Sequence, residues 1–278
     1  MTAPTAYEKN WRDQVSTWPV SQYAVGVTDT KSTIAELGDP LWVTRLASIS
    51  KLFAGFVALV AFEEGSLDLG EPAGPAGSTV RHLLSHAAGF GFNRGDRRSE
   101  PGARRTYSNV GIEVFAEVLT ERTGLSYSDY LQFGVLDPLG MSATSLVGSP
   151  AHGMSSSVHD LLAFARELMT PTLVSPETML MARTPQFAHL DGVVPGFGSQ
   201  KPNPWGLGFE IRGTKTPHWT APDNSPETFG HFGGAGTFLW MDPVVQIACC
   251  CLTNREFGPW AVPLWAPFNA AVLREHGP

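Results

Sequence analysis

A serine and a lysine three residues apart form the first pair in the sequence whose chemistry stands out. They are Ser48 and Lys51, within RLASISKLF at residues 45–53. Residues three apart share a helix face, so the two side chains are expected to meet at the first turn of a helix, whereas Ser50 faces elsewhere. A serine hydroxyl needs a base before it can attack an acyl carbon, and a lysine whose pKa is lowered by burial can be that base. Alone, however, the spacing is common, and a capping serine beside a surface lysine is the simpler interpretation.

A tyrosine and an asparagine two residues apart form a second candidate element. Tyr107 and Asn109 lie in RRTYSNVG, immediately before a strongly helical segment. At a loop-to-helix junction both side chains can point into one cleft, where Tyr107 could relay a proton and Asn109 could hold a substrate amide or Lys51. An aromatic anchor followed by a turn is the simpler alternative.

A histidine followed by glycines forms the third element. His231, Gly233 and Gly234 lie in FGHFGGAGTFLW, at residues 229–240. Glycines there allow a substrate to approach the backbone closely, so the Gly234 N–H could face a developing oxyanion. A glycine-rich hairpin with a loop histidine is the alternative.

The elements that must position these residues follow the order strands, helices, strands, helix. Apolar runs at 23–29 and 32–38 predict a hairpin, 41–48 a third strand or extended lead-in, and 51–65 a helix buried on all sides. Helices are expected at 78–89, 108–124, 126–141 and 155–169, and a closing helix at 268–277. Strands are expected at 205–213, 236–242 and 244–254, while the Pro-, Gly- and Trp-rich stretch 185–227 is interpreted as a lid or pocket wall. This order predicts an α+β fold whose antiparallel β-sheet is built from both ends of the chain and flanked by helices, with a mostly helical subdomain inserted between them.

Composition excludes several other classes of function. The 278 residues are 42% hydrophobic and 16% charged, with a net charge of −7, so no nucleic-acid partner is expected. The cluster Arg94, Arg97, Arg98, Arg104 and Arg105 is interrupted by acidic residues and is interpreted as a solvated loop. No run is long enough for a membrane span and no signal peptide is recognisable, so a cytoplasmic location is expected.

Metal and redox sites are not expected either. Cys249, Cys250 and Cys251 are consecutive, and neighbours on a strand point to opposite faces, so they are interpreted as small buried hydrophobic residues. His82 and His86 have the i, i+4 spacing of metal ligands, but no third ligand is evident. Neither a metal nor an organic cofactor is predicted.

Together, in this order, the three elements resemble the motifs S-x-x-K, Y-x-N and [K/H]-x-G of the serine β-lactamase and penicillin-binding-protein-like hydrolase superfamily, in its class C-like branch. The phrases LLSHAAGF (83–90), VLDPLGM (135–141) and WGLGFE (205–210) add to the resemblance, which covers nearly the whole chain. It implies a single domain over 1–278, with a sheet subdomain from about 1–65 and 200–278 and a helical subdomain from about 66–199.

The resemblance also implies roles for the residues. Ser48 would be the acylated nucleophile, Lys51 and Tyr107 would share the general base and acid work, and Asn109 would position substrate. His231, with Gly233 and Gly234, would line the pocket, and the N–H groups of Ser48 and Gly234 would form the oxyanion hole. Which of Lys51 and Tyr107 is the base stays open.

Two departures from the family pattern bear on the substrate. The third motif has His231 where lysine is commoner in β-lactamases, and the alternative lysine, Lys215, precedes Thr216 and Pro217 and is rejected as a K-T-G motif. The chain is also short for this family. The favoured hypothesis is therefore a carboxylesterase acting on a small ester, with a D-amino-acid peptidase or weak β-lactamase as one alternative and a non-catalytic protein that binds an acyl ligand as another.

Overall fold

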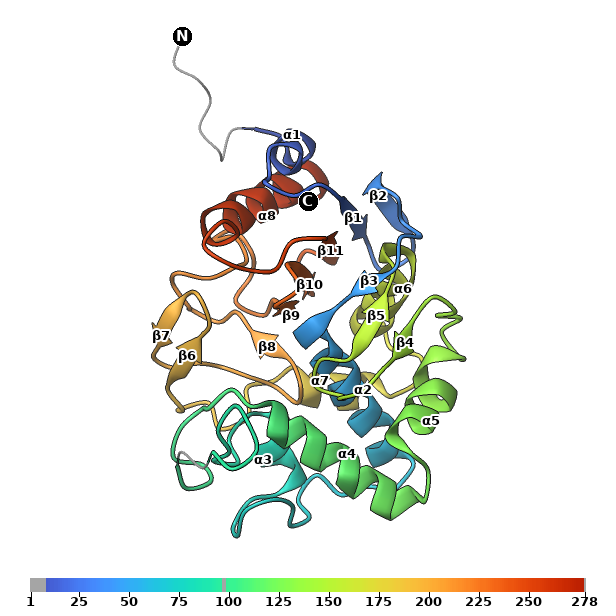
Figure 1. Cartoon of the computed structure of the whole chain (residues 1–278), viewed down its shortest axis with the longest axis vertical. Helices are drawn as coiled ribbons and strands as arrows, with labels where there is room; N and C mark the ends of the chain where they lie inside the picture. Colours follow the sequence, from blue (N-terminus) through green and yellow to red (C-terminus); the bar gives the residue numbers. More distant parts are fainter. Residues whose placement is uncertain (1–8, 97–98, 278) are drawn as a thin grey trace.

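A six-stranded antiparallel sheet forms the centre of the molecule in the computed structural model, which describes residues 9–96 and 99–277 (Figure 1). Its strand order is β2-β1-β11-β10-β9-β8. The strands are β1 (Tyr23–Thr28), β2 (Thr33–Gly38), β8 (Glu210–Ile211), β9 (Phe229–Gly233), β10 (Thr237–Asp242) and β11 (Ile247–Thr253). β1 from the N-terminal part pairs directly with β11 from the C-terminal part, which confirms the predicted α+β fold with a sheet built from both ends of the chain.

Helices cover both faces of this sheet. On one face lie α1 (Trp11–Ser16) and α8 (Val262–His276), which are side by side in Figure 1. On the other face lie α2 (Ser50–Glu63) and α6 (Val158–Met169), and α6 contacts β1, β10 and β11. The cysteines of β11 divide between the two cores: Cys249 and Cys251 pack on the α8 side, and Cys250 packs on the α2 side. All three are free and buried, as the alternation of strand side chains predicts.

The remaining elements surround α2. They are α3 (Val80–Leu84), α4 (Asn109–Thr123), α5 (Tyr127–Leu131), the π-helical turn η2 (Gln132–Leu136) and α7 (Pro176–Ala182). A small antiparallel sheet has the order β3-β5-β4, with β3 (Thr44–Arg45), β4 (Ser145–Leu146) and β5 (Met154–Ser156), and a separate hairpin joins β6 (Gly192–Val194) to β7 (Gly198–Gln200). α3 and α4 lie at the end of the molecule opposite α1 and α8 (Figure 1). The division into two subdomains stays a prediction.

α2 is the helix that the sequence predicts best. Its residues are apolar on every side, and each side chain from Ser50 to Ala61 is buried. A single 3₁₀ turn, η1 (Ala47–Ile49), leads into it. Ser48 therefore belongs to this turn and not to the first turn of the helix, and of the strand or extended lead-in expected over 41–48 only β3 is a strand.

Other differences from the expected elements have local causes. The helix expected over 126–141 ends as α5 and η2, since the chain turns at Asp137–Gly140. The strand expected over 205–213 is only β8, because Gly208 has a positive φ of 83° and the preceding residues form turns. α1 and α7 were not predicted, although Ser175 and Pro176 form a recognisable helix start. Within the described residues, no helix is both long and apolar enough to span a membrane.

Candidate active site

Ser48 lies on a turn that β9 and β10 hold from beneath. The carbonyl of Leu46 accepts a hydrogen bond of 3.0 Å from Thr237 Oγ1. A Cβ atom at Gly233 would lie 2.0 Å from the same carbonyl oxygen, so only glycine allows β9 to approach this closely. Ala47, immediately before Ser48, has a φ of 50°, a left-handed conformation that costs a non-glycine residue about 1–2 kcal/mol. Strain of this kind is typical of functional turns.

The two serines of the first motif have different surroundings. Ser50 Oγ donates 2.6 Å to the carbonyl of Ala47 and accepts 3.0 Å from the Met154 N–H, so it ties the turn to β5. Ser48 lines a pocket instead. The structure thus agrees with the prediction that Ser48, and not Ser50, faces the lysine.

Lys51 is completely buried, and its Nζ atom has three oxygen neighbours. It lies 3.4 Å from Ser48 Oγ, 2.7 Å from Asn109 Oδ1 and 2.9 Å from the carbonyl oxygen of Ala151. Burial lowers the pKa of Lys51 to about 7, although the carboxylate of Glu113 acts in the opposite direction. Near neutral pH a large fraction of this lysine is therefore an uncharged amine.

Tyr107 is held beside the same lysine by the segment that precedes α4. Lys51 Nζ lies 4.7 Å from the centre of the tyrosine ring. The backbone N–H of Ser108 donates to His86 Nδ1, and the imidazole of His86 packs 4.8 Å from the tyrosine ring, so His86 positions this segment. Burial raises the pKa of Tyr107 and the neighbouring Ser48 lowers it, with burial the stronger effect. The hydroxyl of Tyr107 is buried and makes no hydrogen bond of good geometry with any described residue.

His231 faces Tyr107 from strand β9. Their ring centres are 5.7 Å apart. His231 Nδ1 donates a hydrogen bond of 2.5 Å to the carbonyl of Phe232, which assigns the proton to Nδ1. Nε2 is then an acceptor with no partner among the residues that the structure describes. Burial and the nearby Lys51 lower the pKa of His231 to about 4. The imidazole is therefore neutral at neutral pH.

A buried ion pair lies behind these residues and was missed at the sequence level. Glu210 Oε1 accepts 2.9 Å from Lys215 Nζ and 3.1 Å from His218 Nε2, while Oε2 accepts 2.8 Å from Trp219 Nε1. Burial alone would raise the pKa of Glu210, but Lys215 and His218 hold it well below its usual range. Lys215 does not line the pocket, which agrees with its rejection as a third-motif lysine.

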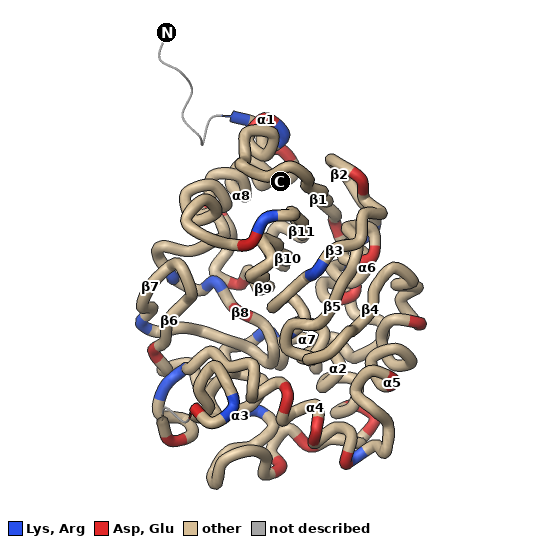
Figure 2. The backbone as a smooth tube through the Cα atoms, in the orientation of Figure 1, with Lys and Arg blue, Asp and Glu red and all other residues tan. Residues whose placement is uncertain are grey.

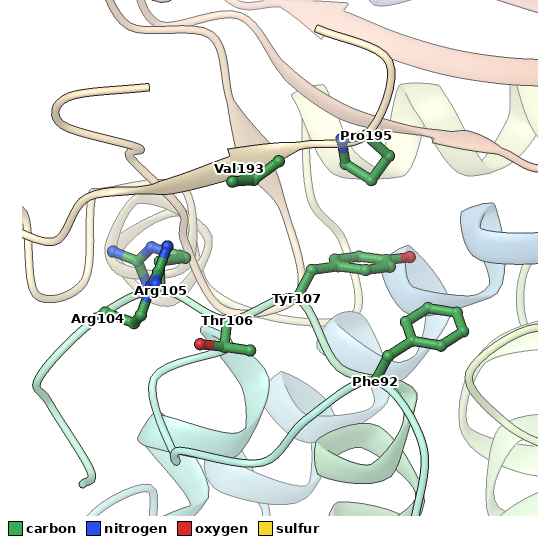
Figure 3. A pocket seen from close by; sticks show the side chains of 7 residues that line it. All are labelled: Phe92, Arg104, Arg105, Thr106, Tyr107, Val193 and Pro195. Carbon is green, nitrogen blue, oxygen red and sulfur yellow. The ribbon is translucent and has the colours of Figure 1, made fainter. Parts of the chain in front are cut away.

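An apolar pocket of about 170 Å³ opens over Ser48. Tyr107, His231 and Gly234 line it, and so do Glu210 and Phe257. Val194, Pro195 and Trp205 also line it. The stretch 185–227 therefore forms part of a pocket wall, which is one of the two roles predicted for it from the sequence. A second pocket of about 260 Å³ adjoins it and shares Phe92, Tyr107 and Pro195 (Figure 3).

The structure brings most of the predicted site residues together. Ser48, Lys51, Tyr107, Asn109 and His231 meet at the junction of η1, α2, α4 and β9. Gly234 lies on the pocket wall, whereas Gly233 packs beneath the turn against Leu46. The described residues contain no cluster of potential metal ligands. The phrase WGLGFE was a sequence signal for Glu210 and Trp205, but nothing in it indicated that both reach the pocket.

Comparison with known proteins assigns this architecture to a family. The sequence profile described as Beta-lactamase matches residues 19–274. The chain belongs to the beta-lactamase family. A crystal structure of a beta-lactamase from Mycobacterium bovis is 45% identical, with a TM-score of 0.94 over 96% of this chain and 100% of that chain.

More distant relatives and structural neighbours differ in size and in their described activities. A putative D-alanyl-D-alanine carboxypeptidase of Escherichia coli O157:H7 is 25% identical over 213 residues, which cover 59% of this chain and 48% of that protein. The chain thus spans about half the length or less of the curated relatives it matches. A solved hydrolase with promiscuous acyltransferase activity has the same fold, with a TM-score of 0.77, 18% identity and coverage of 96% and 98% of the two chains.

Proposed function

We propose that this member of the beta-lactamase family is a serine hydrolase that works through an acyl-enzyme and prefers esters. The observation that carries the proposal is the surroundings of Lys51 Nζ. A neutral amine has two N–H donors and one lone pair. Asn109 Oδ1 and the Ala151 carbonyl accept the two donors, so the lone pair is left for the hydroxyl of Ser48.

Lys51 is accordingly assigned as the base in the attack step. Ser48 Oγ bonds to the acyl carbon while its proton moves to Lys51 Nζ, and a pKa of about 7 suits both acceptance and release of that proton. Tyr107 is a weaker candidate for the base, since its raised pKa keeps it protonated at neutral pH. Its hydroxyl is assigned the transfer of a proton from Lys51 to the departing alcohol, since the tyrosine ring lies beside Lys51 Nζ.

The rest of the pocket would stabilise the charge that develops during attack. The carbonyl oxygen becomes an oxyanion, and the N–H groups of Ser48 and Gly234 are assigned as its donors; such a donor is commonly worth about 3–4 kcal/mol of barrier. Water then attacks the acyl-enzyme, with Lys51 as base again, and releases the acid and Ser48.

The preference for esters rests on the electrostatics beside the third motif. β-Lactams and peptides ending in D-alanine carry a carboxylate close to the scissile amide. His231 is neutral, and Lys215 is engaged in its ion pair with Glu210, so the third motif offers no free cation to such a carboxylate. A neutral ester needs no such cation.

Hydrolysis of 4-nitrophenyl butyrate tests the proposal, with a chromogenic cephalosporin and a dipeptide ending in D-alanine assayed in parallel. The proposal expects ester turnover that falls about a thousandfold or more in Ser48→Ala, with slow or absent cleavage of the other two substrates. Turnover of the dipeptide or the cephalosporin above that of the ester would favour the alternative hydrolases. Equal ester turnover in wild type and Ser48→Ala would overturn the mechanism, and no turnover of any substrate would favour a non-catalytic binding protein.

A further inference from the structure

The pocket that adjoins the site has a different character from the pocket over Ser48. Arg104, Arg105 and Thr106 form one end of it, while Phe92 and Tyr107 form the end next to Ser48, and Val193 and Pro195 lie across from them (Figure 3). Phe92, Tyr107 and Pro195 line both pockets, so the two pockets adjoin each other. A substrate longer than its scissile group would extend from the apolar pocket toward the arginines.

Arg105 and Arg104 differ sharply in their surroundings. Arg105 is only 2% exposed, and the expectation of a solvated loop is wrong for it. Its guanidinium donates to the backbone carbonyls of Ser85, Gln186, Phe187 and Asn203. No carboxylate of the described residues pairs with it. Arg97 and Arg98 of the same cluster lie outside the described residues.

Arg104 is the chemically available member of the pair. Its side chain is exposed, and it forms no hydrogen bond or ion pair with any residue that the structure describes. Its charge adds to the uncompensated charge of Arg105 at one end of an otherwise largely apolar pocket. The chain as a whole has a net charge of −7, and Figure 2 shows both basic and acidic segments on the side where β6, β7 and α3 lie. The lining of this pocket contains two arginines and no acidic residue, which favours an anionic ligand at that end.

We propose that Arg104 forms a carboxylate-binding subsite, and that the preferred substrates are esters with a carboxylate remote from the scissile bond, such as half-esters of small dicarboxylic acids. This inference rests on the proposed function and deepens it. In the inner pocket His231 is neutral and Lys215 is engaged with Glu210, whereas the outer pocket presents the exposed Arg104, which can form a bidentate pair with a carboxylate. The two pockets together thus select both the position and the sign of the charge on the substrate.

Matched pairs of esters test the subsite. The 4-nitrophenyl half-ester of glutaric acid is compared with 4-nitrophenyl valerate, which places the carboxylate in the acyl group. 4-Acetoxybenzoate is compared with its methyl ester, which places it in the leaving group. Wild-type protein is expected to favour the anionic member of at least one pair by about five- to tenfold in kcat/KM, and the preferred pair identifies which part of the substrate lies in the outer pocket.

Arg104→Gln is expected to remove this preference while hydrolysis of the neutral esters stays close to that of wild type. Arg45→Gln is the matched control, because Arg45 is also exposed and unpaired among the described residues but lines a different pocket, beside Ala47 and Gly234. It should retain the preference. An equal loss of the preference in both variants would indicate that the overall positive charge, and not Arg104 itself, causes it, and would overturn the subsite. An unchanged preference in Arg104→Gln, or no preference in wild type, would overturn it too.

The failure of this inference is distinguishable from failure of the proposed function. Hydrolysis of neutral esters without an anionic preference would leave the proposed function intact and reject the subsite. If wild type hydrolyses no ester, the proposed function fails, and calorimetric titration of glutarate into Ser48→Ala protein decides the subsite by itself. Binding that Arg104→Gln abolishes would support the subsite, and absence of binding would reject it.

Discussion

Glu113 follows Asn109 by one turn of α4, so the helix that holds Lys51 through a hydrogen bond also presents a carboxylate to it. Asn109 accepts 2.7 Å from Lys51 Nζ, and the charge of Glu113 raises the pKa of the lysine against the stronger effect of burial. One helix thereby fixes both the orientation of the amine and the pH at which it becomes a base.

The pH dependence of ester hydrolysis follows from this arrangement. Lys51 acts as a base only when neutral, so kcat/KM should rise with pH and level off above about 7. In Glu113→Gln the carboxylate that stabilises the charged lysine is lost, and the pKa of Lys51 falls further. The rising limb of the pH–rate profile should therefore move to lower pH.

Glu117→Gln is the control for this measurement. Glu117 lies one turn further along α4 and pairs with the same Arg94 that contacts Glu113, but it is not among the charges that act on Lys51. Its profile should match that of wild type. If the pH–rate profile of Glu113→Gln were the same as that of wild type, Lys51 would not be the titrating base.

Gly233, the last residue of β9, and Gly234, in the turn that follows, should respond differently to substitution by alanine. A Cβ atom at Gly233 would lie 2.0 Å from Leu46 O and 2.5 Å from Thr237 Oγ1, whereas one at Gly234 would meet no atom within 4 Å. Gly233→Ala is expected to cost about 1–3 kcal/mol of unfolding free energy and to displace the Ser48 turn, while Gly234→Ala should stay within about 0.5 kcal/mol. Urea unfolding of both variants measures the difference, and equal stabilities would contradict the predicted packing of β9 beneath Ser48.

Adjacent arginines should contribute very differently to stability. Arg105→Met would remove the side-chain donor of four carbonyl groups, of which only that of Phe187 keeps another donor among the described residues, the N–H of Leu190, and we expect a loss of about 3 kcal/mol or more. Arg104→Met removes an exposed side chain with no partner among the described residues, so its cost should stay within about 0.5 kcal/mol. Thermal unfolding of the two proteins provides the comparison. Similar melting temperatures would show that the hydrogen bonds from Arg105 to these four carbonyl groups do not stabilise the fold.

The buried pair of Glu210 and Lys215 predicts a non-additive pair of substitutions. Lys215→Met leaves the carboxylate of Glu210 buried without its cation, which should cost about 3–5 kcal/mol. Glu210→Leu combined with Lys215→Met removes both charges and should recover part of this loss. Unfolding free energies of the single and double variants measure the coupling, and additive losses would mean that the two groups do not depend on each other.

Acid should weaken this pair in a defined direction. The folded-state pKa of Glu210 is held well below the value of an unfolded glutamate. Its contribution to stability is therefore fully present above a pH of about 4.5 and is lost as the pH falls below it. Lys215→Met should reduce this part of the acid dependence, since without Lys215 the pKa of Glu210 rises.

The sequence predicted the parts of the site that depend on local spacing and on the family motifs. Ser48 and Lys51 meet because three residues make nearly one helical turn, and α2 is recognisable since every one of its faces is apolar. The short strand β8 was overestimated, because Gly208 ends the extended run in a way that an alternation of apolar residues does not reveal.

The parts that escaped prediction depend on contacts between distant segments. Arg105 belongs to a charged, loop-like stretch, yet its burial follows from carbonyls that lie about 20 to 100 positions away in the sequence. Glu210 reaches the pocket only because Lys215, His218 and Trp219 fold back over β8 and satisfy its carboxylate. No local pattern carries that information, since a buried charge is stable only where its partners converge.

Intact-protein mass spectrometry after reaction with a fluorophosphonate tests the central claim most directly, because the probe forms a covalent bond only with an activated serine. Ser50→Ala is the matched control, since Ser50 lies two residues from Ser48 but bonds to the Ala47 carbonyl and the Met154 N–H. The account predicts one adduct per chain in wild type and in Ser50→Ala, located on Ser48 by peptide mapping, and none in Ser48→Ala. An adduct that persists in Ser48→Ala would contradict the assignment of Ser48 as the nucleophile.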